Sequence, residues 1–562
     1  MSDTEIRRRP VAAAAFEADI HPVVQRVYAA RGLTSADDLD LSLARLLPIG
    51  SLPGVEAAAE LLAAHRAGRV LIVGDFDADG ATSTALMVRA LRSLGFAHVD
   101  YLVPNRFRFG YGLTPEIVTL ALVQSPTLLV TVDNGVSSLE GVEAARARGV
   151  PVLVTDHHLP GTVLPRAAVI VNPNLPGSTF ASRSLAGVGV AFYVIAALAR
   201  RMEQHGFKAA DLLDLVALGT VADVVPLDRN NRVLVDQGLR RIRAGCCVPG
   251  IRALLEAAGR KCERLSAADL GFAVAPRLNA AGRITDMRVG IACLLADAPQ
   301  EAAQLAAQLS KLNEERREIE RRMQLEAIDI AVLARDAGGG EEALGLCLFD
   351  EGWHQGIVGL VAGRIKDRLH RPVIAFARAE DGSLKGSARS VAGVHVRDAL
   401  DSVAVRHPGL ITKFGGHAMA AGLSLPYAHF EAFRAAFARE VAARADAESL
   451  QGVIHSDGEL RGADLSLATA RALRGAGPWG QGFPEPVFDG GFEVIGARVV
   501  GERHLQLGLR SPDGAAVEAI AFGQGGFEQR AGAPLWMAYR LDVNEWGGAE
   551  RLQLICQHLR PA

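Results

Sequence analysis

The sequence lacks any long apolar run, any paired cysteine motif and any complete nucleotide-binding loop. No stretch approaches the roughly 18–20 apolar residues of a membrane span, and residues 1–10 lack the apolar core of a signal peptide. The six cysteines are scattered without a CxxC pair, which excludes a zinc ribbon and predicts free thiols in a cytoplasmic protein. No GxxxxGK[ST] loop is present, and Gly187-Val188-Gly189 lacks the third glycine of a dinucleotide fingerprint.

The bulk numbers describe a soluble globular chain of several domains. A hydrophobic content of 49% and a charged content of 22% are ordinary for such proteins. A chain of 562 residues is too long for one core and favours three or four domains. The formal net charge of −3 argues against a protein that coats DNA, although it leaves room for a local basic track.

What the sequence does contain is a set of acids and a histidine pair, each placed after a short apolar run. The runs are residues 69–73, 127–132, 151–154 and, less clearly, 215–218, and the polar residues that follow them are Asp75, Asp77, Asp79, Asp133, Asp156, His157, His158 and Asp223. Helix-like stretches at 81–94 and 139–148 separate the runs, and this alternation predicts a parallel sheet that is buried on both faces. Because the carboxyl ends of such strands share one rim, we expect these side chains to converge there.

Their chemistry points to bound cations. Carboxylates that converge raise each other's pKa unless a cation lies between them, and oxygen ligands with imidazoles suit Mn²⁺ or Mg²⁺. Five or six such ligands are too many for one catalytic ion and favour two ions roughly 3.5–4 Å apart, the arrangement used for displacement at phosphorus. Asp75, Asp77 and Asp79 are two apart, so an extended backbone would point them the same way. Any one of these acids alone could be a turn residue or a helix cap.

Four segments resemble the motifs of the DHH phosphoesterase superfamily. They are Val-Gly-Asp-Phe-Asp-Ala-Asp-Gly at 73–80, Asp-Asn-Gly at 133–135, Asp-His-His at 156–158 and Gly-Thr-Val-Ala-Asp at 219–223. Within the superfamily the chain is similar, over almost its whole length, to the RecJ family of single-strand-specific 5′→3′ DNA exonucleases. The resemblance implies metal-dependent hydrolysis of single-stranded DNA to 5′-mononucleotides, in DNA recombination and repair.

The expected architecture is α/β with a terminal barrel. We expect a helical segment at 1–45, a parallel-sheet DHH catalytic domain at 46–297, a long connecting helix at 298–336, a smaller α/β DHH-associated nucleic-acid-binding domain at 337–448, and a five-stranded oligonucleotide-binding (OB) type barrel at 449–562. Gly338-Gly339-Gly340 is taken as the boundary after the connecting helix, and residues 511–514 as a hairpin turn.

We expect Asp77, Asp79, Asp133, His157 and Asp223 to hold two Mn²⁺ or Mg²⁺ ions, with Asp133 bridging them. Asp75 is either a further ligand or a support for the ligands. His158 either protonates the leaving oxygen or orients the site, and Asp156 positions the histidines.

A second group of residues is expected to hold the nucleic acid. Its members are Arg106, Tyr111, Arg277, Asn279, Arg283, His354, Ser387, Arg389, Gly415, Gly416, His417 and Trp479, with Phe483, Phe488, His504 and Trp546 as further possible stacking surfaces. Arginine forks bind phosphate strongly, and Arg277 and Arg283 flank a small Asn-Ala-Ala-Gly segment that we interpret as an anion-binding loop. The resemblance implies that arginines here, with Ser387 and Arg389, hold the 5′-terminal phosphate.

Two other functions stay open from the sequence. One is a DHH enzyme acting on small substrates, which would need no barrel. The other is a non-catalytic DNA-binding protein, like the replication-helicase subunit related to this family, although here every ligand position is filled. As partners we expect single-stranded DNA with a free 5′ end, a helicase and a single-stranded-DNA-binding protein, with no membrane and a monomeric protein.

Overall fold

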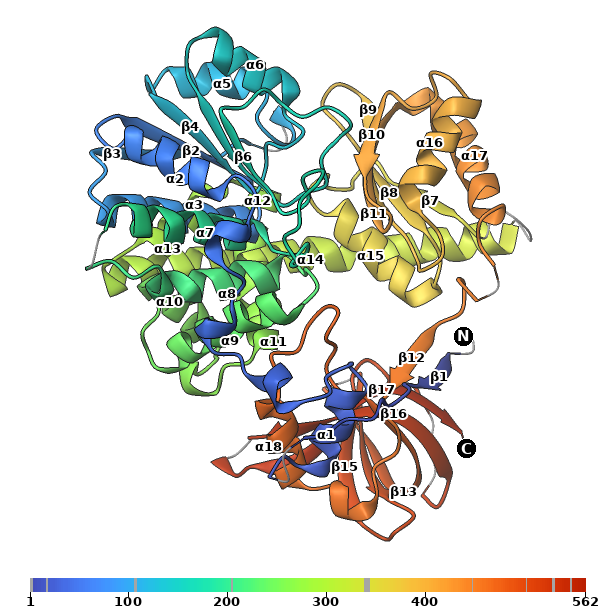
Figure 1. Ribbon diagram of the computed structural model, residues 1–562. Helices are drawn as coiled ribbons and strands as arrows, with labels where there is room; N and C mark the ends of the chain where they lie inside the picture. Colours follow the sequence, from blue (N-terminus) through green and yellow to red (C-terminus); the bar gives the residue numbers. More distant parts are fainter. Residues whose placement is uncertain are drawn as a thin grey trace. The chain divides into compact units, whose positions relative to one another are not determined.

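The computed structural model describes residues 4–16, 19–105, 109–203, 206–337, 344–446, 448–501, 503–527, 531–545 and 548–561. The chain forms two compact units, drawn together in Figure 1. The larger unit combines Arg8–Asn313 with Ser456–Ala562, and the smaller combines Met1–Arg7 with Glu314–His455. The segment expected to be catalytic and the segment expected to be a barrel therefore belong to one unit.

The predicted parallel sheet is confirmed and forms the centre of the larger unit. Its strands lie in the order β3-β2-β4-β5-β6, with bounds β2 Arg69–Gly74, β3 His98–Leu102, β4 Leu128–Val132, β5 Val152–Thr155 and β6 Val169–Val171. Helices α2 (Val55–Ala64), α3 (Ala78–Ser93) and α7 (Gly187–Arg201) cover one face, and α5 (Pro115–Leu122) and α6 (Leu139–Ala147) cover the other (Figure 1).

Successive residues of β2 show why these runs are continuously apolar. Val70 and Ile72 pack into the core on the side of α3 and α7, whereas Leu71 and Val73 pack into the core under α5 and α6. A strand buried on both faces has no polar side to alternate with.

The later part of the catalytic region is helical. Its elements are α8 Leu213–Ala222, α9 Arg229–Arg243, α10 Pro249–Ala257, α11 Ala267–Asp269, the π-helical turn η6 Leu270–Val274, α12 Ala275–Ile284 and α13 Arg288–Leu295, with short 3₁₀ turns at Ala209–Leu212 and Cys262–Arg264.

Two expectations for this region are wrong. Residues 215–218 are not a strand but part of α8, which is buried from Leu213 to Thr220 and so shows no helical period in its sequence. Residues 276–283 are not a loop but part of α12. Their small side chains let α12 approach the loop after β2, where a Cβ on Gly282 would lie 1.9 Å from the Phe76 carbonyl oxygen.

The long connecting helix is present as α14, Pro299–Ala337, which runs from the larger unit into the smaller. Residues 338–340, expected to mark the boundary after it, lie outside the described residues. In the described part of the chain no single helix is long and apolar enough to cross a membrane. One bent pair, Leu43–Ser51 and Val55–Ala64, passes by length and composition alone.

The smaller unit has a mixed sheet in the order β10-β11-β9-β8-β7. Its elements are β7 Leu346–Phe349, α15 Val358–Leu369, β8 Val373–Arg378, β9 Ser383–Arg389, α16 Val396–Arg406, β10 Lys413–Gly416, β11 Ala420–Pro426, the 3₁₀ turn Tyr427–His429 and α17 Phe430–Ala442. Helix α15 and the second half of α14 pack on one face, and α16 and α17 pack on the other.

The predicted barrel is also confirmed. It closes in the order β13-β14-β15-β17-β16, with bounds β13 Phe488–Val500, β14 His504–Arg510, β15 Ala516–Ala521, β16 Pro534–Asn544 and β17 Arg551–Pro561, and it is preceded by the 3₁₀ turn Gly462–Asp464 and by α18 Leu467–Gly475. The expected turn at 511–514 joins the antiparallel strands β14 and β15.

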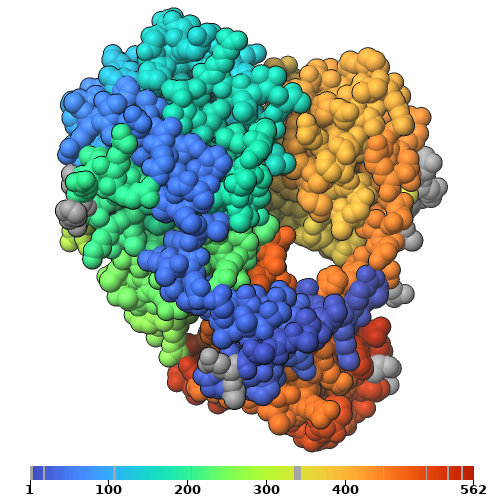
Figure 2. Space-filling model, in the orientation of Figure 1, coloured from blue at the N-terminus to red at the C-terminus, as the bar shows by residue number. Residues whose placement is uncertain are grey.

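We expected residues 1–45 to be helical, and this is only partly correct. Helix α1 (Pro22–Ala29) of this segment packs on the barrel. The segment also contains strand β1 (Glu5–Arg8), which pairs with β12 (Val453–Ser456), and 3₁₀ turns at Ala36–Leu39, Leu43–Arg45 and Ile49–Ser51. Val23, Val24 and Val27 of α1 are buried in the barrel core. Figure 2 shows the segment, in dark blue, lying across the orange and red barrel.

A buried ion pair fastens the segment to the barrel region. Nη1 of Arg31 donates to Oδ1 of Asp457 (2.7 Å) and Nη2 donates to Oδ2 (3.0 Å), and the two side chains are only 2% and 1% exposed. The Arg31 guanidinium also lies 5.2 Å from the centroid of the Trp479 ring. A bidentate pair in this setting leaves an uncompensated buried charge when either partner is removed.

We therefore expect Arg31→Ala to lower the free energy of unfolding by about 3–5 kcal/mol, because Asp457 would stay buried without its cation. The matched variant is Arg45→Ala, which removes pairs with Asp37 and Asp40 in which every side chain is 40% exposed or more and should cost about 1 kcal/mol or less. Urea unfolding followed by tryptophan fluorescence measures both. Equal losses in the two variants would contradict the assignment of this pair as the fastening.

Candidate metal centre

The loop after β2 supplies three acids, but not from an extended backbone as we expected. Asp75 follows the strand, Asp77 caps α3 by accepting a hydrogen bond from the Gly80 amide at Oδ1 (3.0 Å), and Asp79 lies in the first helical turn. The helix begins at Ala78 rather than near 81 because Asp77 satisfies one of its free amides. Asn279 of α12 holds the same turn, since its Oδ1 accepts a hydrogen bond from the Ala78 amide (2.8 Å).

Asp79 connects two helices at the rim of the sheet. Its buried carboxylate accepts hydrogen bonds from the Gly187 amide (2.7 Å) and the Val188 amide (2.9 Å) at the start of α7, where the helix dipole favours an anion. A Cβ on Gly187 would lie 2.7 Å from Oδ1 of Asp133, so this close approach requires glycine. In the sequence, Gly187-Val188-Gly189 shows only as an incomplete dinucleotide motif.

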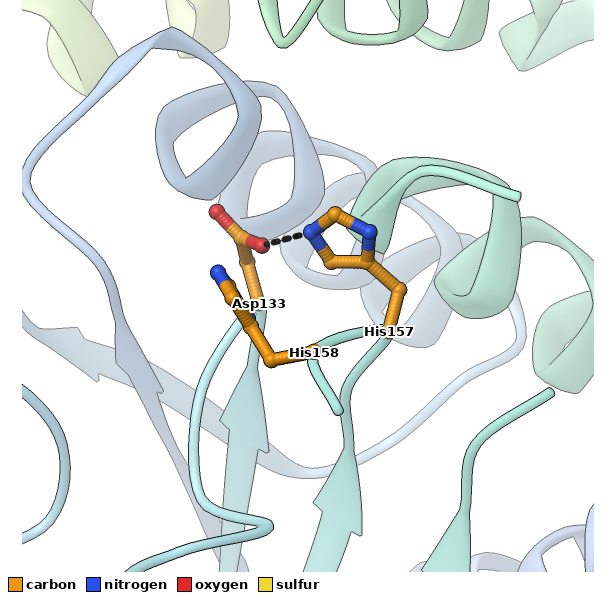
Figure 3. Close-up of side chains that lie close together, drawn as sticks. All are labelled: Asp133, His157 and His158. Atoms are coloured by element: carbon orange, nitrogen blue, oxygen red, sulfur yellow. Dashed lines mark ion pairs between the residues drawn. The ribbon is translucent and has the colours of Figure 1, made fainter. Parts of the chain in front are cut away.

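Asp133, His157 and Asp223 meet at this rim. Asp133 directly follows β4 with a φ of 60°, a left-handed conformation that aspartate tolerates. Nε2 of His157 lies 3.1 Å from Oδ1 of Asp133 and 3.4 Å from Oδ2 of Asp223. Figure 3 shows His157 turned toward Asp133, with His158 beside them. Asp223 comes from the C-terminal end of α8, which corrects the expectation of a strand end.

Asp156 organises the histidine pair. Its Oδ1 accepts the amides of His157 (2.7 Å) and His158 (3.1 Å) and lies 2.7 Å from Nδ1 of His158, while Oδ2 accepts the Val136 amide (2.9 Å). Burial opposes ionisation, but the bond to His158 prevails and lowers the pKa of Asp156. Although burial works against the imidazolium, the bond to Asp156 raises the pKa of His158. Nδ1 of His158 therefore donates to Asp156, and its Nε2 lies 3.4 Å from the Tyr111 hydroxyl.

Three further residues support this pair: one is Tyr111, which the sequence predicts to bind nucleic acid, and the other two are not singled out by the sequence. The Tyr111 hydroxyl donates to the Asp133 carbonyl (3.0 Å) and lies 3.1 Å from Nδ1 of His158. Nδ2 of Asn172 donates to the His158 carbonyl (2.9 Å), and Nδ2 of Asn174 donates to the His157 carbonyl (2.7 Å). Both asparagines follow the end of β6, so polar residues after the short run 169–171 were a usable signal.

The donor set fits a pair of divalent cations. Three groups of potential ligands each have atoms within 4.8 Å of one another: Asp75 with Asp77 and Asp133, Asp133 with His157 and His158, and Asp79 with His157 and Asp223. Asp133 and His157 each belong to two groups, as bridging or neighbouring ligands would. Within the described residues, Oδ1 of Asp133 and Oδ2 of Asp223 are buried and accept no hydrogen bond. Carboxylate oxygens with imidazole suit Mn²⁺ or Mg²⁺.

Mutual repulsion shows in the titration of the cluster. Burial, and then the charge of Asp77, raises the pKa of Asp79 to about 7. Burial, and then the charge of Asp79, raises the pKa of Asp133 and of Asp223 well above the usual range. The cluster therefore holds protons near neutral pH unless cations replace them.

The residues expected to bind nucleic acid in the catalytic region are dispersed. Arg106 lies outside the described residues. Arg277 is directed into the protein, where Nε donates to Oγ of Ser310 (3.0 Å) and the guanidinium also reaches the carbonyls of Ala257 and Ala273. Arg283 is half-buried near the end of α12. The anion-binding loop that we expected at 277–283 is thus a helix, and it packs on the loop after β2 that carries Asp75 and Asp77.

In the smaller unit, Ser387 and Arg389 lie together near the start of α15. Nη1 of Arg389 donates to Oγ of Ser387 (3.2 Å), and a Cβ on Gly359 would lie 3.0 Å from Nη2 of Arg389. Burial lowers the pKa of Arg389. Nδ1 of His354 accepts the Gly356 amide (3.1 Å) in the turn before α15. Gly415 and Gly416 end strand β10, and the exposed His417 follows them.

The aromatic residues near the barrel are mostly engaged in packing. The Trp479 ring stacks on Phe483, with ring centroids 5.1 Å apart, and its Nε1 donates to the Leu473 carbonyl (3.0 Å). Phe488 is fully buried in the barrel core, and Trp546 lies outside the described residues. His504 is half-exposed and packs edge-on against Phe522.

Family models match three parts of the chain: the DHH family N-terminal domain at residues 69–220, the DHHA1 domain at 341–443 and the RecJ OB domain at 456–558. The single-stranded-DNA-specific exonuclease RecJ of Escherichia coli is 52% identical over 582 residues, covering 99% of each chain. The chain belongs to the RecJ family. The RecJ of Thermus thermophilus is 35% identical over 535 residues, covering 94% of this chain and 74% of that relative.

Solved structures of the RecJ family contain the metals that the ligand chemistry favours. The crystal structure of Thermus thermophilus RecJ in complex with Mn²⁺ has a TM-score of 0.83 at 32% identity and covers 99% of this chain and 80% of that one. The Mg²⁺ complex of the same protein has a TM-score of 0.76 at 30% identity, covering 99% and 79%. The metals that the ligand chemistry favours are the metals found with these relatives.

The raised pKa of Asp79 predicts that metal binding strengthens as pH rises through about 7, because protons and Mn²⁺ compete for the cluster. A carboxyl whose folded pKa is raised stabilises the metal-free fold at low pH, and this contribution is lost as pH rises through that pKa. Both effects make the rise in Tm on binding Mn²⁺ larger at higher pH. We expect the rise in Tm on adding Mn²⁺ to EDTA-treated protein, followed by differential scanning calorimetry, to be larger at pH 8 than at pH 6. An equal rise at both values would contradict the protonated cluster.

Proposed function

We propose that the protein hydrolyses single-stranded DNA from its 5′ end and releases 5′-mononucleotides. The observation that carries this proposal is the set of three groups of potential ligands. Asp133 belongs to two of these groups and so does His157, which suits two adjacent cations. Membership of a family of single-stranded-DNA-specific exonucleases supplies the substrate class. The closed OB-type barrel supports a polymeric substrate.

In the proposed mechanism, Asp77, Asp79, Asp133, His157 and Asp223 hold the two cations. When bound, the ions supply an activated water for in-line attack on phosphorus and stabilise the charge of the transition state. Asp75 lies with Asp77 and Asp133, which favours a ligand role over a purely supporting one. Asp156 holds Nδ1 of His158, and we assign to this histidine the transfer of a proton to the leaving oxygen.

Selection of the 5′ end is assigned to Ser387 and Arg389. The half-buried guanidinium of Arg389 donates to Oγ of Ser387 and to the Ala388 carbonyl, which are both neutral acceptors. Burial lowers the pKa of Arg389, but the guanidinium stays charged. A terminal phosphate would supply an anion for this charge, with further stabilisation from the amides that open α15. Preference for that phosphate would admit a 5′ end and so set the direction.

The alternatives are weaker. An enzyme for small substrates has no use for a barrel whose core also holds the N-terminal helix α1. A non-catalytic scaffold has no reason to keep acidic side chains buried together at the cost of raised pKa values. A helicase and a single-stranded-DNA-binding protein as partners, a monomeric state and a cytoplasmic location stay predictions.

Asp133→Asn should reduce cleavage to the background level and leave binding of single-stranded DNA unchanged, because the isosteric amide removes a shared cation ligand without changing the fold. The assay uses end-labelled 5′-phosphorylated single strands, the same strand blocked at its 3′ or 5′ end, and a duplex. Only the 5′ block and the duplex should prevent mononucleotide release by the wild type. The control is Asp381→Asn, an exposed loop residue. Cleavage by Asp133→Asn at the control rate would contradict the site.

Arg389→Ala should lower kcat/KM for 5′-phosphorylated strands about 10- to 100-fold, the usual worth of a hydrogen-bonded charge. Strands with a 5′-hydroxyl should be cleaved by the variant and the wild type at similar rates. Arg434→Ala, which removes an exposed pair with Glu431 in the same unit, is the matched control. If Arg389→Ala keeps the full preference for the 5′-phosphate, the phosphate binds elsewhere.

A further inference from the structure

Exposed apolar side chains directly follow two residues of the candidate metal centre in the sequence. Val224 directly follows Asp223 and is 63% exposed, and Leu159 directly follows His158 and is 62% exposed. Phe272, in the π-helical turn η6, is 85% exposed. Acids inside with large apolar groups outside reverse the usual distribution in a soluble protein, and such exposed groups mark binding surfaces when they gather at one place.

Contacts place the turn that carries Phe272 against the helix that carries Asp223. A Cβ on Gly271 would lie 3.2 Å from Cγ1 of Val221, near the C-terminal end of α8. The Val224 amide donates to the Val221 carbonyl (3.3 Å), so Val224 lies one turn further along the same end. The turn that carries the exposed Phe272 therefore packs beside the end of α8 from which Asp223 comes.

The same turn is tied to the acid loop after β2. Helix α12 continues directly from η6, and its Asn279 holds the Ala78 amide (2.8 Å). Gly282 of α12 lies against the Phe76 carbonyl. The continuous segment that begins with the Phe272 turn thus contacts the metal centre at two places, at α8 through η6 and at the first turn of α3 through α12.

The local backbone keeps these side chains exposed at some cost. Leu270, Ala273 and Val274 of η6 are buried, and the π-helical turn directs only Phe272 and its flanking glycine outward. Single π-turns occur often at functional sites. Val224 has a φ of +61°, which is strained for a β-branched residue. Packing of the core does not require either side chain to face solvent.

We propose that Phe272, on the turn that packs against the end of α8, is a platform on which the nucleobase next to the scissile phosphate stacks. This inference rests on the proposed function, since a strand whose phosphate lies at the cations carries its base onto the adjoining surface. Every base offers a π face, so such a platform is tolerant of sequence. A base within a duplex is already stacked and paired, so the platform favours an unpaired strand and contributes to single-strand selectivity.

The test compares Phe272→Ala, Phe272→Leu and Phe272→Trp with the wild type. Loss of the ring in the Ala and Leu variants should raise KM for single-stranded DNA about 5- to 100-fold with little change in kcat, and the Trp variant should keep the wild-type KM. A strand with an abasic nucleotide at the scissile position should give the wild type the high KM of Phe272→Ala. The matched control is Val123→Ala, an 82% exposed side chain elsewhere in the same unit.

Two further readouts separate failure of the platform from failure of the proposed function. Bis(p-nitrophenyl) phosphate reports on the metal centre alone and should be hydrolysed equally by the wild type and Phe272→Leu. The fluorescence of 2-aminopurine in the strand is measured with proteins that all carry Asp133→Asn. The fluorescence should be quenched with Phe272 and with Phe272→Trp, and it should not be quenched with Phe272→Leu. Equal KM and equal quenching in the wild type and both ring-less variants would overturn the platform, whether or not the protein cleaves DNA.

Discussion

Carboxylates that are buried side by side must share their space with protons or cations, and the structure of the catalytic region depends on this constraint. Asp79, Asp133 and Asp223 come from three different elements and meet at a single rim, where burial, and then the charges of neighbouring acids, raises their pKa values. Asp156 is the exception, because burial is outweighed there by the bond to His158, which lowers the pKa of Asp156. The direction of the pKa shift therefore separates Asp79, Asp133 and Asp223, the candidates to bind a cation, from Asp156, which orients the histidines.

The fold holds this cluster together by letting helices approach closely. Helix α7 begins on the Asp79 carboxylate, and its Gly187 lies against Asp133. Helix α12 approaches from another direction, where Asn279 bonds to the first turn of α3. Side chains of ordinary size at these points would separate the ligands. The small residues around the site are therefore part of its geometry, although they contribute no ligand.

Much of this was predictable from the sequence, and the failures have physical causes. The strands were found because a parallel sheet buried on both faces produces continuous apolar runs, and Asp133 and Asp156 follow two of them directly. The same reasoning misassigned Asp223, since the fully buried α8 shows no helical period. The prediction of Arg277 as a phosphate ligand is not supported, because a sequence shows the charge of a side chain but not where the side chain points. The Arg277 side chain bonds to Ser310 and to backbone carbonyls. Asn172 and Asn174 were missed because their role is to hold backbone carbonyls.

The most direct test of the central claim is the electron paramagnetic resonance spectrum of the metal-free protein as it is titrated with Mn²⁺. Because Asp133 and His157 each belong to two of the three groups of potential ligands, we expect two ions to bind per chain and to be magnetically coupled. The spectrum at two equivalents should show the multiline signal of a coupled pair, and the signal should be absent in Asp133→Asn. Saturation at one equivalent, with the six-line signal of an isolated ion, would contradict the account.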